Sequence, residues 1–197
     1  MKLDFIEIGT SNFDTLIEKA DESTFGISIE PVNIYLDDLP NPKNVHKLNY
    51  VISLDGSEDP VDVYYIKPEI IDKFRLKNYL KGCNSVKKYH PLHIQHNLQK
   101  YVTIDVVQQI CIGRLYDLFH IEHLAYLKID TEGGDCCILD QYYDFILDKP
   151  SLYPMKIKFE TNSLSNTTHV ESVLKKYHSI GYKSSKERQD TVLMLKS

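Results

Sequence analysis

Carboxylate side chains follow an apolar segment that has the pattern of a buried strand. Residues 124–129 are mostly apolar and are followed by Asp130, Glu132 and a Gly133-Gly134-Asp135 turn. Glycines let a ligand approach the backbone, and carboxylates held at a strand end can bind hydroxyl groups, attract a cation or accept a proton. This pattern therefore predicts a ligand crevice with acid–base chemistry at the end of the strand.

The first two apolar segments end in a similar way. Gly9 follows the segment at residues 3–8, and Glu30 ends the segment at residues 25–30. Their separation is close to the roughly 20 residues at which an acidic group meets the ribose hydroxyls of an adenosine cofactor. We expect Glu30 to take the ribose and Gly9 to allow close backbone approach. The cofactor-binding residues predicted in this region are Glu7, Gly9, Thr10, Ser11 and Glu30, and Asp130 is predicted to contact the cofactor from its own strand end.

The charges at these positions favour one adenosine cofactor over another. A dinucleotide needs Gly-x-Gly-x-x-Gly, whereas Ser11 and Asp14 occupy the second and third glycine positions, and Asp14 would repel a phosphate. S-adenosylmethionine has no phosphate and carries an ammonium and a sulfonium, which carboxylates stabilise. The sequence therefore favours S-adenosylmethionine, with an NAD-type Rossmann oxidoreductase as the alternative.

Alternating strands and helices are needed to position these side chains. The sequence predicts a single α/β domain over residues 1–197, with a Rossmann-like, doubly wound, mainly parallel seven-stranded sheet, helices on both faces and a C-terminal antiparallel hairpin. Strands are expected at residues 3–8, 25–30, 50–55, 124–131 and 155–160, with an antiparallel edge strand at 61–66 paired with the third strand and a hairpin from 182 to 195. Helices are expected at residues 14–20, 106–121, from 135 onward and 168–178. Residues 67–104 form the least regular part and are predicted to be an insert that shapes a pocket.

The composition excludes several classes of protein. The net charge of -5 gives no electrostatic reason to expect nucleic acid, and no run of residues has the length of a membrane-spanning helix. No signal region precedes the first strand, so we expect a cytoplasmic protein that does not bind a membrane. The four cysteines lack metal-site spacing, and free thiols in a reducing compartment are expected.

The motifs of the chain resemble those of FkbM-type methyltransferases, over residues 4–195. This resemblance implies the class I, Rossmann-like fold of S-adenosylmethionine-dependent enzymes and O-methylation of a hydroxyl, often on a sugar or a natural product. The sequence departs from the family pattern at Phe13, where a second glycine is usual. The motifs that carry the resemblance are Glu7-Ile8-Gly9-Thr10-Ser11, Ser28-Ile29-Glu30-Pro31, Gly82-Cys83-Asn84-Ser85, Thr103-Ile104-Asp105, Leu127-Lys128-Ile129-Asp130-Thr131-Glu132-Gly133, Phe159-Glu160 and Gly181-Tyr182.

Methyl transfer to a hydroxyl requires a group that removes the hydroxyl proton. Asp130 is the first candidate because it ends the strand expected beside the first one, with Glu132 and Glu160 as the next choices and hydrogen bonding to turn amides as their alternative role. Lys128 is expected to pair with Asp130. We expect the adenine of the cofactor to be flanked by Ser53, Leu54 and Asp55.

Metal binding is a weaker interpretation at two places. Asp130, Glu160 and Asn162 could form an oxygen-rich site for a divalent cation, which we do not predict to be required. His90, His93 and His96 have a spacing of three, but Pro91 disfavours a regular helix starting at His90, and a zinc site is not predicted. The insert is instead expected to bind the substrate, through Asn84, Ser85, His90 and His93.

The acceptor is expected to be a hydroxyl of a sugar, nucleotide sugar or glycan. Three alternatives stay open for what covers it: the insert alone, a second subunit in a homodimer, or an open site that admits a large glycan. A non-catalytic subunit that binds S-adenosylmethionine is the remaining alternative to an enzyme.

Overall fold

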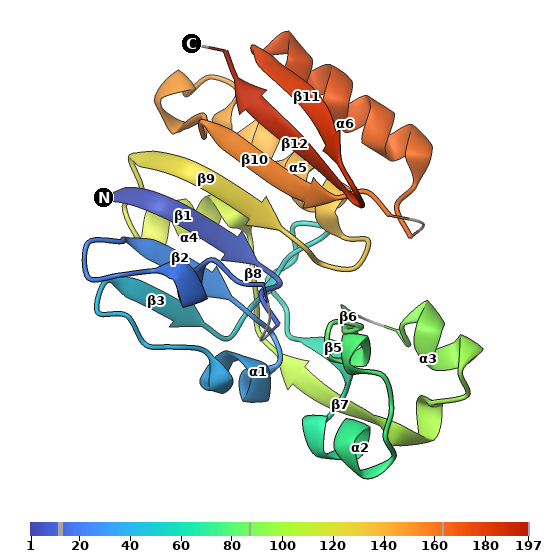
Figure 1. The fold of residues 1–197 in the computed structure, drawn as a ribbon. Helices are drawn as coiled ribbons and strands as arrows, with labels where there is room; N and C mark the ends of the chain where they lie inside the picture. The colour runs from blue at the N-terminus through green and yellow to red at the C-terminus, as the bar shows by residue number, and fades with distance from the viewer. Residues whose placement is uncertain (12–13, 87, 163, 197) are drawn as a thin grey trace.

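A seven-stranded, mostly parallel sheet forms the centre of the protein. The computed structural model describes residues 1–11, 14–86, 88–162 and 164–196. The strands lie in the order β3-β2-β1-β9-β10-β12-β11, where only the β10–β12 and β12–β11 pairs are antiparallel (Figure 1). The predicted mixed sheet with a C-terminal hairpin is therefore confirmed. The strands are β1 (Lys2–Ile8), β2 (Gly26–Ile29), β3 (Val45–Leu48), β9 (His123–Ile129), β10 (Lys156–Glu160), β11 (Tyr182–Glu187) and β12 (Asp190–Leu195).

Apolar side chains from the central strands and from three helices form the largest core cluster. Ile6 of β1, Leu127 of β9 and Ile157 of β10 are fully buried, as expected for parallel strands that are covered by other elements. The helix α5 contributes Ile138, Leu139, Tyr142 and Ile146, whose spacing places them on one stripe of the helix. The three helices that contribute side chains to this core are α4 (Ile112–Leu118), α5 (Asp135–Ile146) and α6 (Thr167–Ser179).

A second, smaller sheet is built by the insert and the strands that flank it. In this sheet β5 pairs antiparallel with both β6 and β7. Figure 1 shows the small sheet and its helices on the side toward which the arrows of β1 and β9 point. The insert therefore lies beyond the carboxyl ends of the central strands, where the sequence places the carboxylates. The insert contains α2 (Pro68–Lys73), β6 (Ser85–Val86) and α3 (Pro91–Gln95), and the flanking strands are β5 (Val61–Ile66) and β7 (Val102–Val107).

Two predictions about strands are wrong. The third strand of the main sheet is β3 (Val45–Leu48), not residues 50–55, because β3 continues the parallel pairing with β2 over four positions. Of the predicted segment, β4 (Val51–Ile52) pairs with β8 (Gln109–Ile110) in a separate two-stranded sheet. The strand at 61–66 also does not pair with the third strand, because its six positions are matched by β7.

Two predicted helices are also much shorter than expected. Only a three-residue 3-10 helix, Ile17–Lys19, lies within residues 14–20, where Asp14 has a left-handed backbone (φ 52°) that a helix does not tolerate. Residues 106–121 supply the end of β7, β8 and then α4, because Val107 and Gln109 pair as strands. Phe13 lies outside the described residues. Among the described residues, no helix has the length and apolar character needed to cross a membrane.

Candidate functional site

A cavity of about 1070 Å³ lies between the ends of the central strands and the insert. Its size is at the upper end of the roughly 300–1,000 Å³ typical of small-molecule sites. The cavity spans the gap where the sheet order reverses, since β1 is followed by β2 on one side and by β9 on the other. Ligands of open α/β sheets bind at this kind of reversal point. Among the described lining residues, five are acidic: Glu30, Asp130, Glu132, Glu160 and Asp190. Two are basic, Lys88 and Arg188, and His90 also lines the cavity.

Gly9 lines the cavity at the end of β1 and closes tightly on the neighbouring strand. It has a φ of 76°, and a Cβ built on it would lie 1.9 Å from the backbone oxygen of Asp130. Only glycine fits both the left-handed backbone and this contact. The close contact observed at Gly9 is with the backbone at the end of β9. The approach of a ligand to Gly9 stays a prediction. The contact fixes the ends of β1 and β9 against each other at the cavity.

Glu30 lies at the end of β2 on the other side of this turn. Its carboxylate accepts hydrogen bonds from the Ser11 amide at 2.7 Å and from the Val32 amide at 2.9 Å, and it lines the cavity. Burial raises the pKa of Glu30 to about 7, with the two amides opposing this shift and the charge of Asp130 adding to it. Glu30 is therefore held in a fixed position at the place where the sequence predicts the ribose-binding carboxylate.

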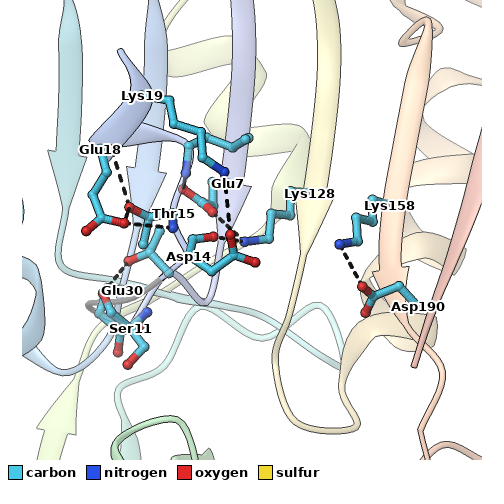
Figure 2. Close-up of polar contacts among 12 residues, drawn as sticks. Glu7, Ser11, Asp14, Thr15, Glu18, Lys19, Glu30, Lys128, Lys158 and Asp190 are labelled. Carbon is cyan, nitrogen blue, oxygen red and sulfur yellow. Dashed lines mark hydrogen bonds and ion pairs between the residues drawn. The ribbon is translucent and has the colours of Figure 1, made fainter. Parts of the chain in front are cut away.

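Glu7 has a different role from the one predicted for it. Its carboxylate is fully buried, accepts from Lys128 Nζ at 2.8 Å and from the Leu16 amide at 2.8 Å, and does not line the cavity (Figure 2). Lys128 also donates to the backbone oxygen of Asp14. The predicted pairing of Lys128 with Asp130 is replaced by this ion pair, because Glu7 and Lys128 are direct neighbours in the register of β1 and β9. Glu7 thus stabilises the turn after β1 and does not reach the cavity.

Three carboxylates meet at the ends of β9 and β10. One oxygen from each of Asp130, Glu132 and Glu160 lies within 4.8 Å of the others. Burial raises the pKa of Asp130 to about 7, and Asp135 adds to the effect while Lys128 opposes it. Burial also raises the pKa of Glu160 to about 8, reinforced by Glu132 and Asp130. Asp130 and Glu160 therefore hold protons at a pH where free carboxylates are ionised.

Asp135 fixes the geometry of this cluster without entering the cavity. Its Oδ1 accepts from the amide and hydroxyl of Thr131, and its Oδ2 accepts from the Glu160 amide at 2.7 Å. Asp135 is the first residue of α5, after Gly134 at the cap position, and its side chain ties the end of β9 to the end of β10.

Replacing Asp135 by asparagine should destabilise the protein by about 2 kcal/mol, because the amide group presents donors to groups that are themselves donors. Denaturant unfolding of the wild type and Asp135→Asn measures this difference. Asp140→Asn, whose carboxylate bonds His169 and Lys176 at the half-exposed surface of α5, is the matched control and should cost well under half as much. Equal losses in the two variants would contradict the role given to Asp135.

His90 connects the insert to this cluster. It is fully buried at the N-cap of α3, where its Nδ1 accepts a hydrogen bond from the Leu92 amide at 3.2 Å. Its Nε2 lies 3.2 Å from Glu132 Oε2. Because Nδ1 accepts a hydrogen bond, the proton of the neutral ring must be on Nε2, and Nε2 donates to Glu132.

The structure brings most of the predicted site residues to one cavity. Glu7, Ser53, Asp55 and His93 do not line it: Ser53 is buried, Asp55 accepts from the Ser57 amide, and His93 is buried behind His90. Burial lowers the pKa of His93 to about 4. The predicted residues that do line the cavity are Gly9, Thr10, Ser11, Glu30, Leu54, Asn84, Ser85, His90, Asp130, Glu132, Glu160 and Asn162.

Several lining residues are absent from the sequence prediction. Arg188, Gln189 and Asp190 form the tip of the β11–β12 hairpin, and Asp190 also pairs with Lys158 at 2.6 Å (Figure 2). The hairpin is visible in the sequence, but its contact with the cavity depends on the insertion of β12 between β10 and β11. Tyr50, outside the predicted adenine-flanking positions, also lines the cavity.

Among the described residues, two groups of side chains have donor atoms close enough to share a metal ion. One is Asp130, Glu132 and Glu160, and the other is Cys83, His90 and Glu132. Asn162, the third member of the predicted cation site, has its amide oxygen occupied by the Leu164 amide at 2.7 Å, and Glu132 takes its place. His90 is poorly suited as a ligand because its Nε2 carries the proton, whereas a metal needs the lone pair of that nitrogen.

The raised pKa values predict how stability changes with pH. The folded protein binds more protons than the unfolded chain between the ordinary carboxyl pKa and the values of about 7 to 8 for Glu30, Asp130 and Glu160. The free energy of unfolding should therefore fall as pH rises, by on the order of 2 kcal/mol from pH 6.5 to 8.5. Below pH 6.5, His93 acts in the opposite direction, because it must stay neutral when folded.

Urea unfolding across pH 6.5 to 8.5 measures this slope. Glu160→Gln removes one of the titrating groups and should flatten it. A stability that is constant or increases over this range would contradict the proton binding inferred for the cluster.

Comparisons of the chain with models of protein families, with curated proteins and with solved structures find no match. The functional interpretation therefore depends on the geometry of the cavity and on the motifs of the sequence.

Proposed function

We propose that the protein is an S-adenosylmethionine-dependent O-methyltransferase that acts on a hydroxyl of a sugar, nucleotide sugar or glycan. The observation that carries this proposal is the position of Glu30, at the cavity-facing end of β2 beside the Gly9 turn. A carboxylate at this place in a doubly wound sheet binds the ribose of an adenosine cofactor. The motif resemblance to FkbM-type methyltransferases supports the same class, with the Rossmann-like sheet covered by helices on both faces.

The order of the strands supports a methyl donor over a dinucleotide. Numbered along the chain, the seven strands of the main sheet follow the order 3-2-1-4-5-7-6. The first five agree with the dinucleotide-binding order 3-2-1-4-5-6, which supports a ligand crevice between β1 and β9. The antiparallel β12, inserted before β11, departs from that order and forms the hairpin that the resemblance implies.

The local structure after β1 also disfavours a pyrophosphate. The first helical segment in the described residues after Gly9 is the three-residue Ile17–Lys19, which offers no long helix whose N-terminus would face a phosphate. Acidic residues outnumber Lys and Arg in the cavity lining, and a bound cation favours the ionised form of the carboxylates whose pKa is raised by burial. An NAD-type oxidoreductase is therefore the weaker candidate.

The residues of the cavity have separate roles in this proposal. S-adenosylmethionine supplies an electrophilic methyl group when bound. Glu30 holds the ribose, and the Gly9 turn together with Thr10 and Ser11 places backbone atoms beside the cofactor. Burial under the insert excludes water that would compete with the acceptor. The carboxylates at the ends of β9 and β10 orient the acceptor hydroxyl and take its proton.

The rest of the cavity suits a polar acceptor with a ring. Its volume of about 1070 Å³ provides space for an acceptor beside the adenosine moiety. Tyr79 and Tyr89 offer aromatic faces that can stack on a sugar ring, and Asn84 and Gln95 offer amides for its hydroxyls. All four residues belong to the insert, which is therefore the element that we assign to acceptor binding.

Free cysteines among the described residues agree with a reducing compartment such as the cytoplasm.

Isothermal titration calorimetry tests the cofactor class. We expect 1:1 binding of both S-adenosylmethionine and S-adenosylhomocysteine, and weaker or no binding of NAD⁺ and NADH. Binding of NAD(H) in preference to both adenosyl ligands would overturn the proposal. A methyl-transfer assay with radiolabelled S-adenosylmethionine and a panel of sugars, nucleotide sugars and glycans then identifies the acceptor.

A further inference from the structure

Glu132 is held in the cavity from two sides. Its backbone is left-handed (φ 54°) and is followed by Gly133 with a φ of 102°. A non-glycine residue in this conformation is strained, and it persists only where its surroundings hold it. The turn carries the side chain of Glu132 into the cavity, where His90 of the insert donates a hydrogen bond to Oε2.

His90 is itself prevented from turning or changing tautomer. It is fully buried, and its Nδ1 is occupied by the Leu92 amide. Pro91, between them, has no amide hydrogen that could compete for Nδ1. The Nε2 proton therefore points at one acceptor, Glu132, and the distance along the chain between the two residues means that the insert and the main sheet must be docked for the contact to form.

The two neighbouring carboxylates are less suited to accept a proton. Burial raises the pKa of Asp130 to about 7 and that of Glu160 to about 8, so both are partly protonated near neutral pH. Glu160 Oε2 is buried without a hydrogen-bond partner among the described residues. Three carboxylate oxygens within 4.8 Å cannot all carry a full charge. Glu132 instead receives a hydrogen bond from His90, a fully buried ring that the Leu92 amide holds in place.

We propose that Glu132 is the catalytic base that faces the transferred methyl group, and that His90 is the residue that positions it. This inference rests on the proposed function. The acceptor oxygen forms a bond to the methyl carbon as the methyl–sulfur bond breaks, and the electron pair of that bond stays on sulfur, which becomes a neutral thioether. The acceptor proton passes to the free carboxylate oxygen of Glu132 and from there to solvent.

Two stable ligands test this assignment without a known acceptor. S-adenosylhomocysteine is neutral at sulfur, whereas sinefungin carries an ammonium group where the methyl would be. A carboxylate facing the methyl position should therefore bind sinefungin more tightly, by about tenfold or more for a charge-assisted hydrogen bond. The ratio of the two dissociation constants, measured by calorimetry, reports on the groups around the methyl position because the rest of the ligands is shared, and the variants below assign the effect to Glu132.

Three variants separate a positioning role from a structural one. Glu132→Gln removes the charge. His90→Asn keeps an oxygen that can accept from the Leu92 amide, since asparagine is a good N-cap, but it is too short to reach Glu132. His90→Gln keeps a donor that can reach Glu132 and caps the helix poorly. Ile94→Ala, at an exposed position of the same helix, is the control.

We expect the sinefungin preference to fall about tenfold in Glu132→Gln and His90→Asn, while both remain as heat-stable as the wild type or nearly so. His90→Gln should melt at a lower temperature but keep most of the preference, and Ile94→Ala should keep all of it. If both ligands bind and the preference survives in Glu132→Gln and His90→Asn, or follows the melting temperature across the variants, the assignment is overturned and the cofactor class stands. If neither ligand binds the wild type, the proposed function itself fails, and this inference with it.

Discussion

Glu30→Gln is expected to weaken the binding of S-adenosylhomocysteine about 100-fold. In the proposed complex the carboxylate accepts from both ribose hydroxyls, and two charge-assisted hydrogen bonds contribute about 1.5 to 3 kcal/mol each. Glutamine offers one acceptor oxygen and places an amide donor toward the amide of Ser11 or Val32. Calorimetry on the folded variant measures the loss.

Asp4→Asn is the matched control for this variant. Asp4 lies near the N-terminal end of β1, whereas the cavity is at the C-terminal end of this strand. The carboxylate of Asp4 also accepts a hydrogen bond from a backbone amide, that of Phe25, at 2.8 Å. This variant removes an exposed carboxylate–amide contact outside the cavity lining, and its affinity for S-adenosylhomocysteine should stay within about twofold of the wild type. A folded Glu30→Gln protein with unchanged affinity would contradict the ribose-binding role of Glu30.

Gly9→Ala is expected to destabilise the protein by about 4 kcal/mol or more, which is a large part of the roughly 5 to 15 kcal/mol by which a domain is stable. The added Cβ would lie 1.9 Å from the backbone oxygen of Asp130 and 2.8 Å from its carbonyl carbon. Neither atom belongs to a flexible side chain, so β1 and β9 would have to separate at the edge of the cavity. Thermal and denaturant unfolding measure the effect.

Gly56→Ala isolates the contribution of the close contact. Gly56 has a similar backbone (φ 83°), but a Cβ added there meets nothing within 4 Å. Only the cost of a left-handed backbone remains, about 1 to 2 kcal/mol. Similar losses in the two variants would show that the contact of Gly9 with the β9 backbone is not what requires glycine.

The central strands could be predicted from the sequence because burial on both faces gives them continuous apolar runs. β2 and β9 contain runs of this kind, whereas β10 alternates partly exposed lysines with the buried Ile157 and Phe159. The hairpin and the helices α5 and α6 were also predicted, from their own patterns. The third strand, Val45–Leu48, was not predicted, because its four residues are all partly or fully exposed and do not form an apolar run. The helical spacing at residues 106–121 was misleading, because long-range pairing with β5 and β4 fixes residues 102–110 as strands.

The sequence predicted some of the residues that line the cavity but not the contacts between them. Positions that directly end a strand, such as Glu30 and Asp130, were found because the end of a parallel strand is a local feature. The orientation of Glu7 depends on the register between β1 and β9, which places Lys128 beside it. The contact of His90 with Glu132 depends on the docking of the insert. Neither register nor docking is encoded in the spacing of residues along one segment.

A crystal structure of the complex with S-adenosylhomocysteine tests the central claim most directly. The ribose hydroxyls should lie within hydrogen-bonding distance of Glu30, with the sulfur beside the Gly9 turn and facing Asp130 and Glu132. A ligand bound outside the cavity, or inside it with the ribose away from Glu30, would contradict the proposed methyltransferase site.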